Sequence, residues 1–293
     1  MALSQADFRS TLQSIASKGP QQRAQEYLSA FRSLLDQPRS SLSSEQLLSS
    51  SSHFLDAAVF SDLNASGGGL IVGRSTLSGF DECIKEVVGR SSPGGEASDA
   101  QDDPNQPAVL DEEVRVQLYQ NALERIQPRL LSFEEQASAI CLSLADAHEA
   151  LQDWTAAAKA LQEIPLDSGH RTVSSQIKLR IYMRIVRLLL EADDAISADA
   201  YLKRASMVVH TVPGTGVGGG ITSSDASADS DTPQASTSGS SQDIKEGKVL
   251  GLQYKLCQAR IYDSQRRFSE AAVRFHDLSY VTDIDADERL MML

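Results

Sequence analysis

Apolar residues recur at helical spacing through the middle of the chain, where LERIQPRLLSFEEQ occupies residues 123–136. An apolar residue at every fourth position predicts one buried helix stripe from residue 114 to residue 126. Pro128 lacks an N–H and clashes with the carbonyl four residues back, so this helix should end near Gln127. The stripe consists of Val114, Leu118, Ala122 and Ile126.

A second helix is predicted directly after this corner. Ser132 is followed three residues later by Glu135, which is the pattern of a capping box at a helix start. Such a cap stabilises a helix by about 1 kcal/mol. Because the link is so short, the two helices should lie nearly antiparallel. The predicted buried side of the second helix comprises Ala137, Ile140, Cys141, Leu144, Ala147 and Leu151.

Three segments resemble one another, at residues 142–161, 184–203 and 256–275. In each, one helix ends, a short polar turn follows, and a large apolar residue precedes further alanines. The large residue should fill the gap between neighbouring helices, and a small residue four positions later should permit their close approach. The large residues are Trp154, Ile196 and Phe268, and the small ones are Ala158, Ala200 and Ala272.

The spacing of these segments supports a repeat with one interruption. From Trp154 to Ile196 is 42 residues, and from Ile196 to Phe268 is 72. The excess falls in residues 211–247, a stretch rich in Gly, Ser, Thr and Asp. Such a stretch buries too little apolar surface to offset its ordering entropy, so we predict that it is disordered. Without most of it the period returns to about 42, within the range of two-helix repeats.

The predicted fold is therefore all-α, a right-handed helical-repeat (TPR/HEAT-like) solenoid of antiparallel helix pairs. We expect N-terminal helical repeats in 1–88, with weaker helical signals near 5–17, 21–35, 44–60 and 76–88 and a loop at Gly67, Gly68 and Gly69. A disordered linker is expected at 89–110, helical repeats at 111–210, the disordered insertion at 211–247, and a further helical repeat at 248–293.

Composition narrows the possible partners. The formal net charge is −13, which opposes nonspecific binding to nucleic acid or anionic lipid, and no run approaches the roughly 20 apolar residues of a membrane helix. We therefore expect protein partners, no nucleic acid and no membrane. The start of the chain carries no continuous apolar stretch, so we expect no secretory signal. The thiols of Cys83, Cys141 and Cys257 should then be reduced and buried.

Two short patterns are candidates for chemistry. Gly214, Gly216 and Gly219 fit G-x-G-x-x-G, but a dinucleotide site needs a buried strand before these glycines and a helix after them. His148-Glu149 is half of a zinc-protease motif, and the position of its second histidine holds Gln152. Flexible filler and a capped helix are the favoured interpretations. A nucleotide-dependent enzyme using the glycines stays open as a rival class.

Charged clusters add no catalytic candidate. Acidic groups at 111–113 and at Asp283, Asp285 and Asp287 suit helix starts and solvated turns. The basic pairs Lys203-Arg204 and Arg266-Arg267 suit solvated helix ends, or contacts with an acidic partner. We expect no catalytic residue, no cofactor and no metal site, and hence no enzyme.

Several of these stretches also resemble a known family. LERIQPRLLSFEEQ, DWTAAAKALQEIPLDSGH, IYMRIVRLLLEADDAISADAYLKRAS and YKLCQARIYDSQRRFSEAAVRFHDLSY resemble, in order, the helical-repeat arms of the PCI superfamily found in the COP-nine (COP9) signalosome. The resemblance runs from about Leu118 to about Leu290 and implies a non-catalytic scaffold subunit. In the family, a winged-helix PCI module follows, and this chain stops at Leu293 before it.

The resemblance also implies a function and partners. The signalosome removes a ubiquitin-like modifier from cullins (deneddylation), and its zinc isopeptidase belongs to another subunit. The implied partners are other signalosome subunits and a cullin–RING ligase, in nucleus and cytoplasm. The alternatives are a proteasome-lid PCI subunit and a generic helical-repeat adaptor. A tetratricopeptide adaptor, with a period of about 34 residues, fits the spacing less well.

Overall fold

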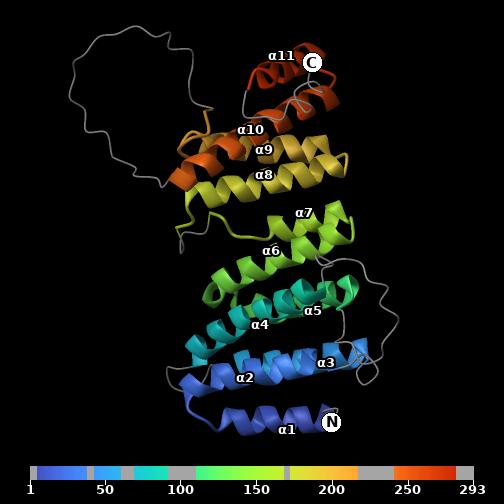
Figure 1. Cartoon of the computed structure of the whole chain (residues 1–293), viewed down its shortest axis with the longest axis vertical. Coiled ribbons are helices and arrows are strands. Elements are labelled where there is room, and N and C mark those ends of the chain that lie inside the picture. Colours follow the sequence, from blue (N-terminus) through green and yellow to red (C-terminus); the bar gives the residue numbers. More distant parts are fainter. Residues whose placement is uncertain are drawn as a thin grey trace, which may run out of the picture. The chain divides into compact units, whose positions relative to one another are not determined.

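The structure, a computed structural model, describes residues 5–37, 43–60, 69–91, 110–167, 172–216 and 241–281, and all regular structure within them is helical (Figure 1). This confirms the predicted all-α helical-repeat fold. The chain divides into two compact units, with the boundary between Pro165 and Leu166. The predicted linker at 89–110 and insertion at 211–247 lie mostly outside the described residues, where their disorder stays a prediction. Their predicted bounds were wrong at two ends, because helix α4 (Gly69–Ser91) continues to Ser91 and helix α10 (Ser241–Ser264) begins at Ser241.

The first unit contains the helices up to α7, and each packs on a helix one or two places away along the chain, as α5 packs on α6 and α4 packs on α2 and α6. Its N-terminal helices match the predicted segments, except that the fourth starts seven residues before the predicted 76 and includes Gly69, predicted as loop. The elements are α1 Gln5–Ala16, α2 Pro20–Leu35, α3 Ser44–Leu55, the π-helical turn η1 Asp56–Phe60, α4 Gly69–Ser91, α5 Glu112–Ile126, the 3-10 turn η2 Gln127–Ser132, α6 Glu134–Ala150 and α7 Trp154–Gln162.

The second unit is built from two helix pairs, α8 Ser175–Glu191 with α9 Ala195–Val209, and α10 Ser241–Ser264 with α11 Phe268–Ser279. Ion pairs fix the direction of α10 along α8. Near their starts, Arg180 lies 2.6 Å from Glu246, and near their ends, Arg260 lies 2.9 Å from Glu191. The two helices therefore run parallel, as the first helices of successive repeats do.

One turn geometry joins α6 to α7, α8 to α9, and α10 to α11. Gln152, Asp193 and Arg266 have φ angles of 60°, 58° and 61°, in the left-handed region that non-glycine residues seldom adopt. The following N–H donates in each case to the carbonyl five residues back, as in a Schellman turn. These bonds join Asp153 to His148 at 2.9 Å, Asp194 to Leu189 at 2.9 Å, and Arg267 to Tyr262 at 2.8 Å. The predicted repeat of hairpins is thus real.

The predicted alignment of the middle hairpin was wrong by one residue. The turn geometry matches Trp154 with Ala195 and Phe268, because these are the first residues of α7, α9 and α11. Ile196 is the second residue of its helix and is 86% exposed.

The predicted roles of large and small residues after the turn were also largely wrong. Phe268 is 62% exposed, and Trp154 is only partly buried. The first residue of the second helix in each hairpin therefore does not fill the gap to the first helix. Three positions later the side chain faces the preceding helix, and there all three hairpins place a buried alanine. These are Ala157, Ala198 and Ala271. Of the predicted small residues Ala158 is buried, whereas Ala200 and Ala272 are exposed.

The corner between α5 and α6 follows the apolar pattern but not the predicted cap. Helix α5 ends at Ile126, before Pro128, as predicted. The chain then makes the 3-10 turn η2, and α6 begins at Glu134 with Phe133 as its N-cap residue, so the capping box at Ser132 and Glu135 was wrong. A Cβ atom on Gly73 would lie 3.2 Å from the buried Phe133 ring. Packing of this ring against α4 sets where α6 starts.

A buried carboxylate connects three helices of the first unit. Asp81 of α4 accepts hydrogen bonds from the Tyr119 hydroxyl of α5 at 3.2 Å and from the Ser143 hydroxyl of α6 at 2.6 Å. Lys85 lies 2.7 Å from its other oxygen. Burial, together with the charge of Asp81, raises the pKa of Tyr119, so the phenol stays a donor. Helices α4, α5 and α6 are held by one polar centre.

Two substitutions in α9 test the corrected alignment. Ala198→Leu should lower the free energy of unfolding by about 1–3 kcal/mol, because added methylenes in a close-packed interface force neighbours apart. Ile196→Ala should change it by less than about 0.5 kcal/mol, because the side chain is exposed. Urea denaturation followed by circular dichroism measures both. A larger loss of unfolding free energy for Ile196→Ala than for Ala198→Leu would contradict the corrected alignment and support the match of Ile196 with Trp154 and Phe268.

Acid titration tests the caps of α7 and α9. Asp153 accepts from the Ala156 N–H, and Asp194 from the Ser197 N–H, both at 3.0 Å. These hydrogen bonds hold the pKa of each aspartate below its usual value, with a hydroxyl contributing at each: Thr155 for Asp153 and Ser197 for Asp194. Because the folded-state pKa is depressed, the caps stabilise the fold fully above the ordinary aspartate pKa, and this stabilisation is lost as pH falls through the folded value.

The double variant Asp153→Asn, Asp194→Asn should therefore lose less unfolding free energy than the parent chain between pH 5 and pH 3. Asparagine still caps a helix but does not titrate in this range. Asp193→Asn changes a neighbouring carboxylate that caps no helix and serves as the matched control. Equal acid sensitivity of the double variant and the parent would contradict the assignment of these caps.

Candidate interaction surface

Of the glycines singled out in the sequence, Gly214 has a packing role, because a Cβ atom on it would lie 2.5 Å from the Ile244 carbonyl oxygen, whereas one on Gly216 would meet no atom within 4 Å. Gly214 and Gly216 have φ angles of 89° and 62°, and Gly219 lies outside the described residues. They follow the end of α9, not a strand, and Pro213–Thr215 lies against α10. A Cβ atom on Gly247 would come within 2.0 Å of the Pro213 carbonyl oxygen, and one on Gly251 within 2.0 Å of that of Thr215. Glycines in α10 thus allow two backbones to touch.

The half zinc motif does not form a metal site in the described geometry. His148 lies near the end of α6 and is largely buried, and burial lowers the pKa of its imidazole. Gln152, where the second ligand would be needed, is the left-handed residue of the turn. In the described parts of the chain no three His, Cys, Asp or Glu side chains gather as metal ligands would.

The other charged candidates are placed mostly at helix termini. Asp111 is the N-cap residue of α5, and Glu112 and Glu113 lie in its first turn, as predicted. The acidic residues at 283–287 lie outside the described segments. Lys203 pairs with Asp199 at 2.8 Å. The guanidinium groups of Arg204 and Arg267 lie over the rings of Tyr201 and Tyr262, at 4.9 and 4.5 Å.

All three cysteines are free and buried, as predicted. Burial raises the pKa of Cys141 to about 12 and that of Cys257 to about 11, and it raises the pKa of Cys83 as well. A thiol with so high a pKa is protonated at neutral pH and is a poor nucleophile. These residues act as small apolar side chains in the core.

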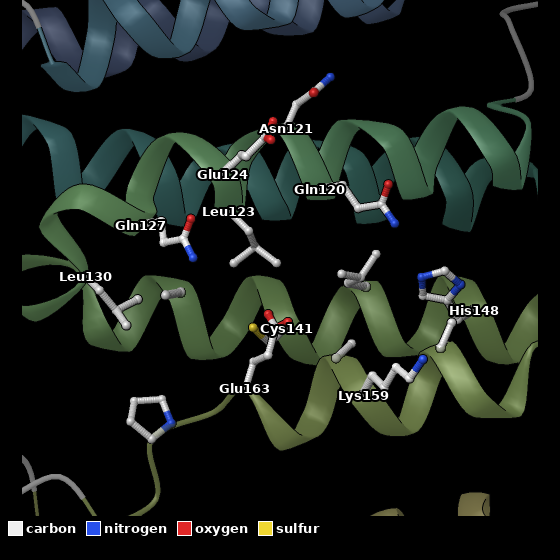
Figure 2. Close-up of a pocket in the computed structure, with 15 residues that line it drawn as sticks. Gln120, Asn121, Leu123, Glu124, Gln127, Leu130, Cys141, His148, Lys159 and Glu163 are labelled. Atoms are coloured by element: carbon white, nitrogen blue, oxygen red, sulfur yellow. The ribbon is translucent and has the colours of Figure 1, made fainter.

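A groove of about 770 Å³ lies over α6 in the first unit (Figure 2). Its floor is one stripe of α6, formed by Ala137, Cys141, Leu144 and His148. Ala137, Cys141 and Leu144 had been predicted as core and are indeed buried. His148 had been expected on the surface of its helix, and this was wrong, because it is buried as well. The sequence pattern did not indicate that one side of the stripe would line an open groove, because periodicity does not tell how closely the flanking helices cover it.

The two walls of the groove differ in chemistry. Figure 2 shows Gln120 and Leu123 of α5, and Gln127 at the start of η2, directed toward α6. From the opposite wall, Glu163 lies beside Cys141 and Lys159 lies toward the His148 end. The groove is an apolar floor between amide and charged side chains, with no nucleophile activated by a neighbouring base. It suits binding better than catalysis.

Among the described helices, none combines the length and the hydropathy needed to cross a membrane. The observations together define a class: an all-helical repeat protein with a surface groove.

The comparison with known proteins narrows this class. Residues 98–215 match the family model described as PSMD12/CSN4, N-terminal. The chain is 37% identical over 172 residues to COP9 signalosome complex subunit 4 of Arabidopsis thaliana, which covers 59% of this chain and 35% of the relative. It is 34% identical over 171 residues to COP9 signalosome complex subunit 4 of Drosophila melanogaster, and this alignment covers 58% of this chain and 34% of the relative.

A further relative aligns over most of the chain. The subunit 4 of Emericella nidulans is 28% identical over 269 residues, which is 92% of this chain and 51% of the relative. The chain therefore spans about a third to a half of the length of these curated relatives. The similarity includes the N-terminal helices, for which the sequence patterns alone were weak.

Proposed function

We propose that the chain acts as the helical-repeat arm of a COP9 signalosome subunit of the subunit 4 type. In this role it has no catalytic activity of its own and supports removal of a ubiquitin-like modifier from cullins through protein contacts. The observation that carries the proposal is the similarity to curated subunits of that name, which in one case extends over 92% of the chain.

Physical features support a scaffold role. The described side chains include no ligand cluster for a metal ion, and the buried thiols have raised pKa values. The net charge of −13 favours protein partners over nucleic acid and anionic membranes. The proposal includes the sister subunits and a cullin–RING ligase as partners, and residence in nucleus and cytoplasm.

A second candidate is a subunit of the proteasome lid. The description of the matching family model favours this candidate as well, because it names PSMD12 beside CSN4. The two candidates share a fold, so the structure does not separate them, and the names of the curated relatives favour the signalosome. Their partners differ completely.

Affinity purification of the tagged chain from its own cells, with mass spectrometry, tests the proposal. We expect signalosome subunits and cullins to be enriched at least about tenfold over a tag-only control. Enrichment of proteasome base ATPases without signalosome subunits would contradict the proposal and support the lid. The purified chain alone should leave a modified cullin uncleaved, and cleavage that a chelator abolishes would contradict the non-catalytic role.

A further inference from the structure

The groove over α6 carries a carboxylate without a partner. Glu163 follows the end of α7 and is exposed. Neither Glu163 nor Glu124, at the rim on α5, forms an ion pair or side-chain hydrogen bond among the described residues. By contrast, the buried carboxylate of Asp81 in the same unit is paired with Lys85. An unpaired carboxylate in a groove can form an ion pair with a cationic group of a ligand.

The charge along the groove is not uniform. Lys159 lies one helical turn before Glu163 on the same wall, toward the His148 end. Burial lowers the pKa of His148, so this imidazole adds no positive charge at neutral pH. The groove therefore has an acidic position at Glu163, beside Cys141, and a basic position at Lys159, toward His148. A ligand with a cationic group would have one favoured orientation.

The α5 wall indicates the backbone conformation of the ligand. Gln120 and Gln127 project toward the groove on either side of Leu123 (Figure 2). An amide side chain both donates and accepts hydrogen bonds. It can satisfy the N–H and C=O groups of an extended peptide, which would otherwise lose water without compensation. A helical ligand satisfies these groups internally and gains nothing from the amides.

The apolar side chains of the groove indicate those of the ligand. Ala137, Cys141 and Leu144 from α6, with Ala160 from α7, close the bottom of the groove and are themselves buried. The apolar side chains that stay accessible in the groove are those of Leu123 and Leu130. Small aliphatic side chains of an extended peptide can pack beside these two leucines, and each CH₂ removed from water contributes about 0.8 kcal/mol.

The geometry points to a docking groove for an extended segment of a partner protein, with a Lys or Arg at Glu163 and small aliphatic residues beside Leu123 and Leu130. This inference rests on the proposed function in one respect, that the partner is a protein. It adds the chemistry of the partner's docking segment.

Selection from a random 12-residue peptide library displayed on phage, with the whole chain as bait, tests the groove. We expect enriched sequences to carry Lys or Arg next to Ala, Val or Leu. A synthetic copy of the strongest sequence, labelled with fluorescein, is then titrated by fluorescence anisotropy against the parent chain and its variants.

Glu163→Lys should weaken binding of that peptide about tenfold, because like charges then meet at the groove. Replacing the peptide's Lys or Arg with Glu should restore binding to this variant. Lysine near a helix C-terminus is favourable to the helix dipole, so the variant should fold, which its thermal melt checks. Glu113→Lys makes the same charge change on α5 outside the groove and should leave binding unchanged.

Failure to enrich any sequence, enrichment of acidic sequences, or equal weakening by Glu163→Lys and Glu113→Lys would overturn the inference. So would a bound peptide shown by circular dichroism to be helical. These outcomes are separate from failure of the proposed function, because co-purification with signalosome subunits is measured independently on the parent chain.

Discussion

The left-handed residue between paired helices is the constraint on which the rest of the structure depends. At Gln152, Asp193 and Arg266 the backbone takes a φ near 60°, and the next N–H closes back on the carbonyl five residues earlier. This closure satisfies carbonyl groups at the helix end and reverses the chain within a few residues. It also places the fourth residue of the following helix against the preceding one. Only a small side chain fits there, which explains the buried Ala157, Ala198 and Ala271.

The same arrangement accounts for the character of the surface. Helices that pack through alanines lie close together. The space between neighbouring helices then forms a groove on the surface, such as the one over α6. A buried titratable side chain can also join helices, as Asp81 joins α4, α5 and α6. A surface of this kind has area and pattern for recognising other proteins. The similarity to subunit 4 of the COP9 signalosome is in keeping with such a role.

Much of the fold could be predicted from apolar spacing and one proline. The stripe at Leu118, Ala122 and Ile126 is buried, and Pro128 ends the helix where expected. The register of the middle hairpin could not be predicted, because the left-handed positions hold Gln, Asp and Arg. A glycine at these positions would have marked the left-handed conformation in the sequence. The capping box at Ser132 failed because burial of Phe133, a long-range contact with Gly73, outweighs a local cap worth about 1 kcal/mol. The groove was missed because its floor has the spacing of ordinary core.

The most direct test of this account is the backbone conformation at the three turns in solution. Cα and Cβ chemical shifts and three-bond HN–Hα couplings, measured by NMR on the labelled chain, report φ for each residue. The account predicts values characteristic of positive φ at Gln152, Asp193 and Arg266 alike, with helical values resuming from Trp154, Ala195 and Phe268. Helical or extended values at any two of the three turns would show that the hairpins are not one repeated unit.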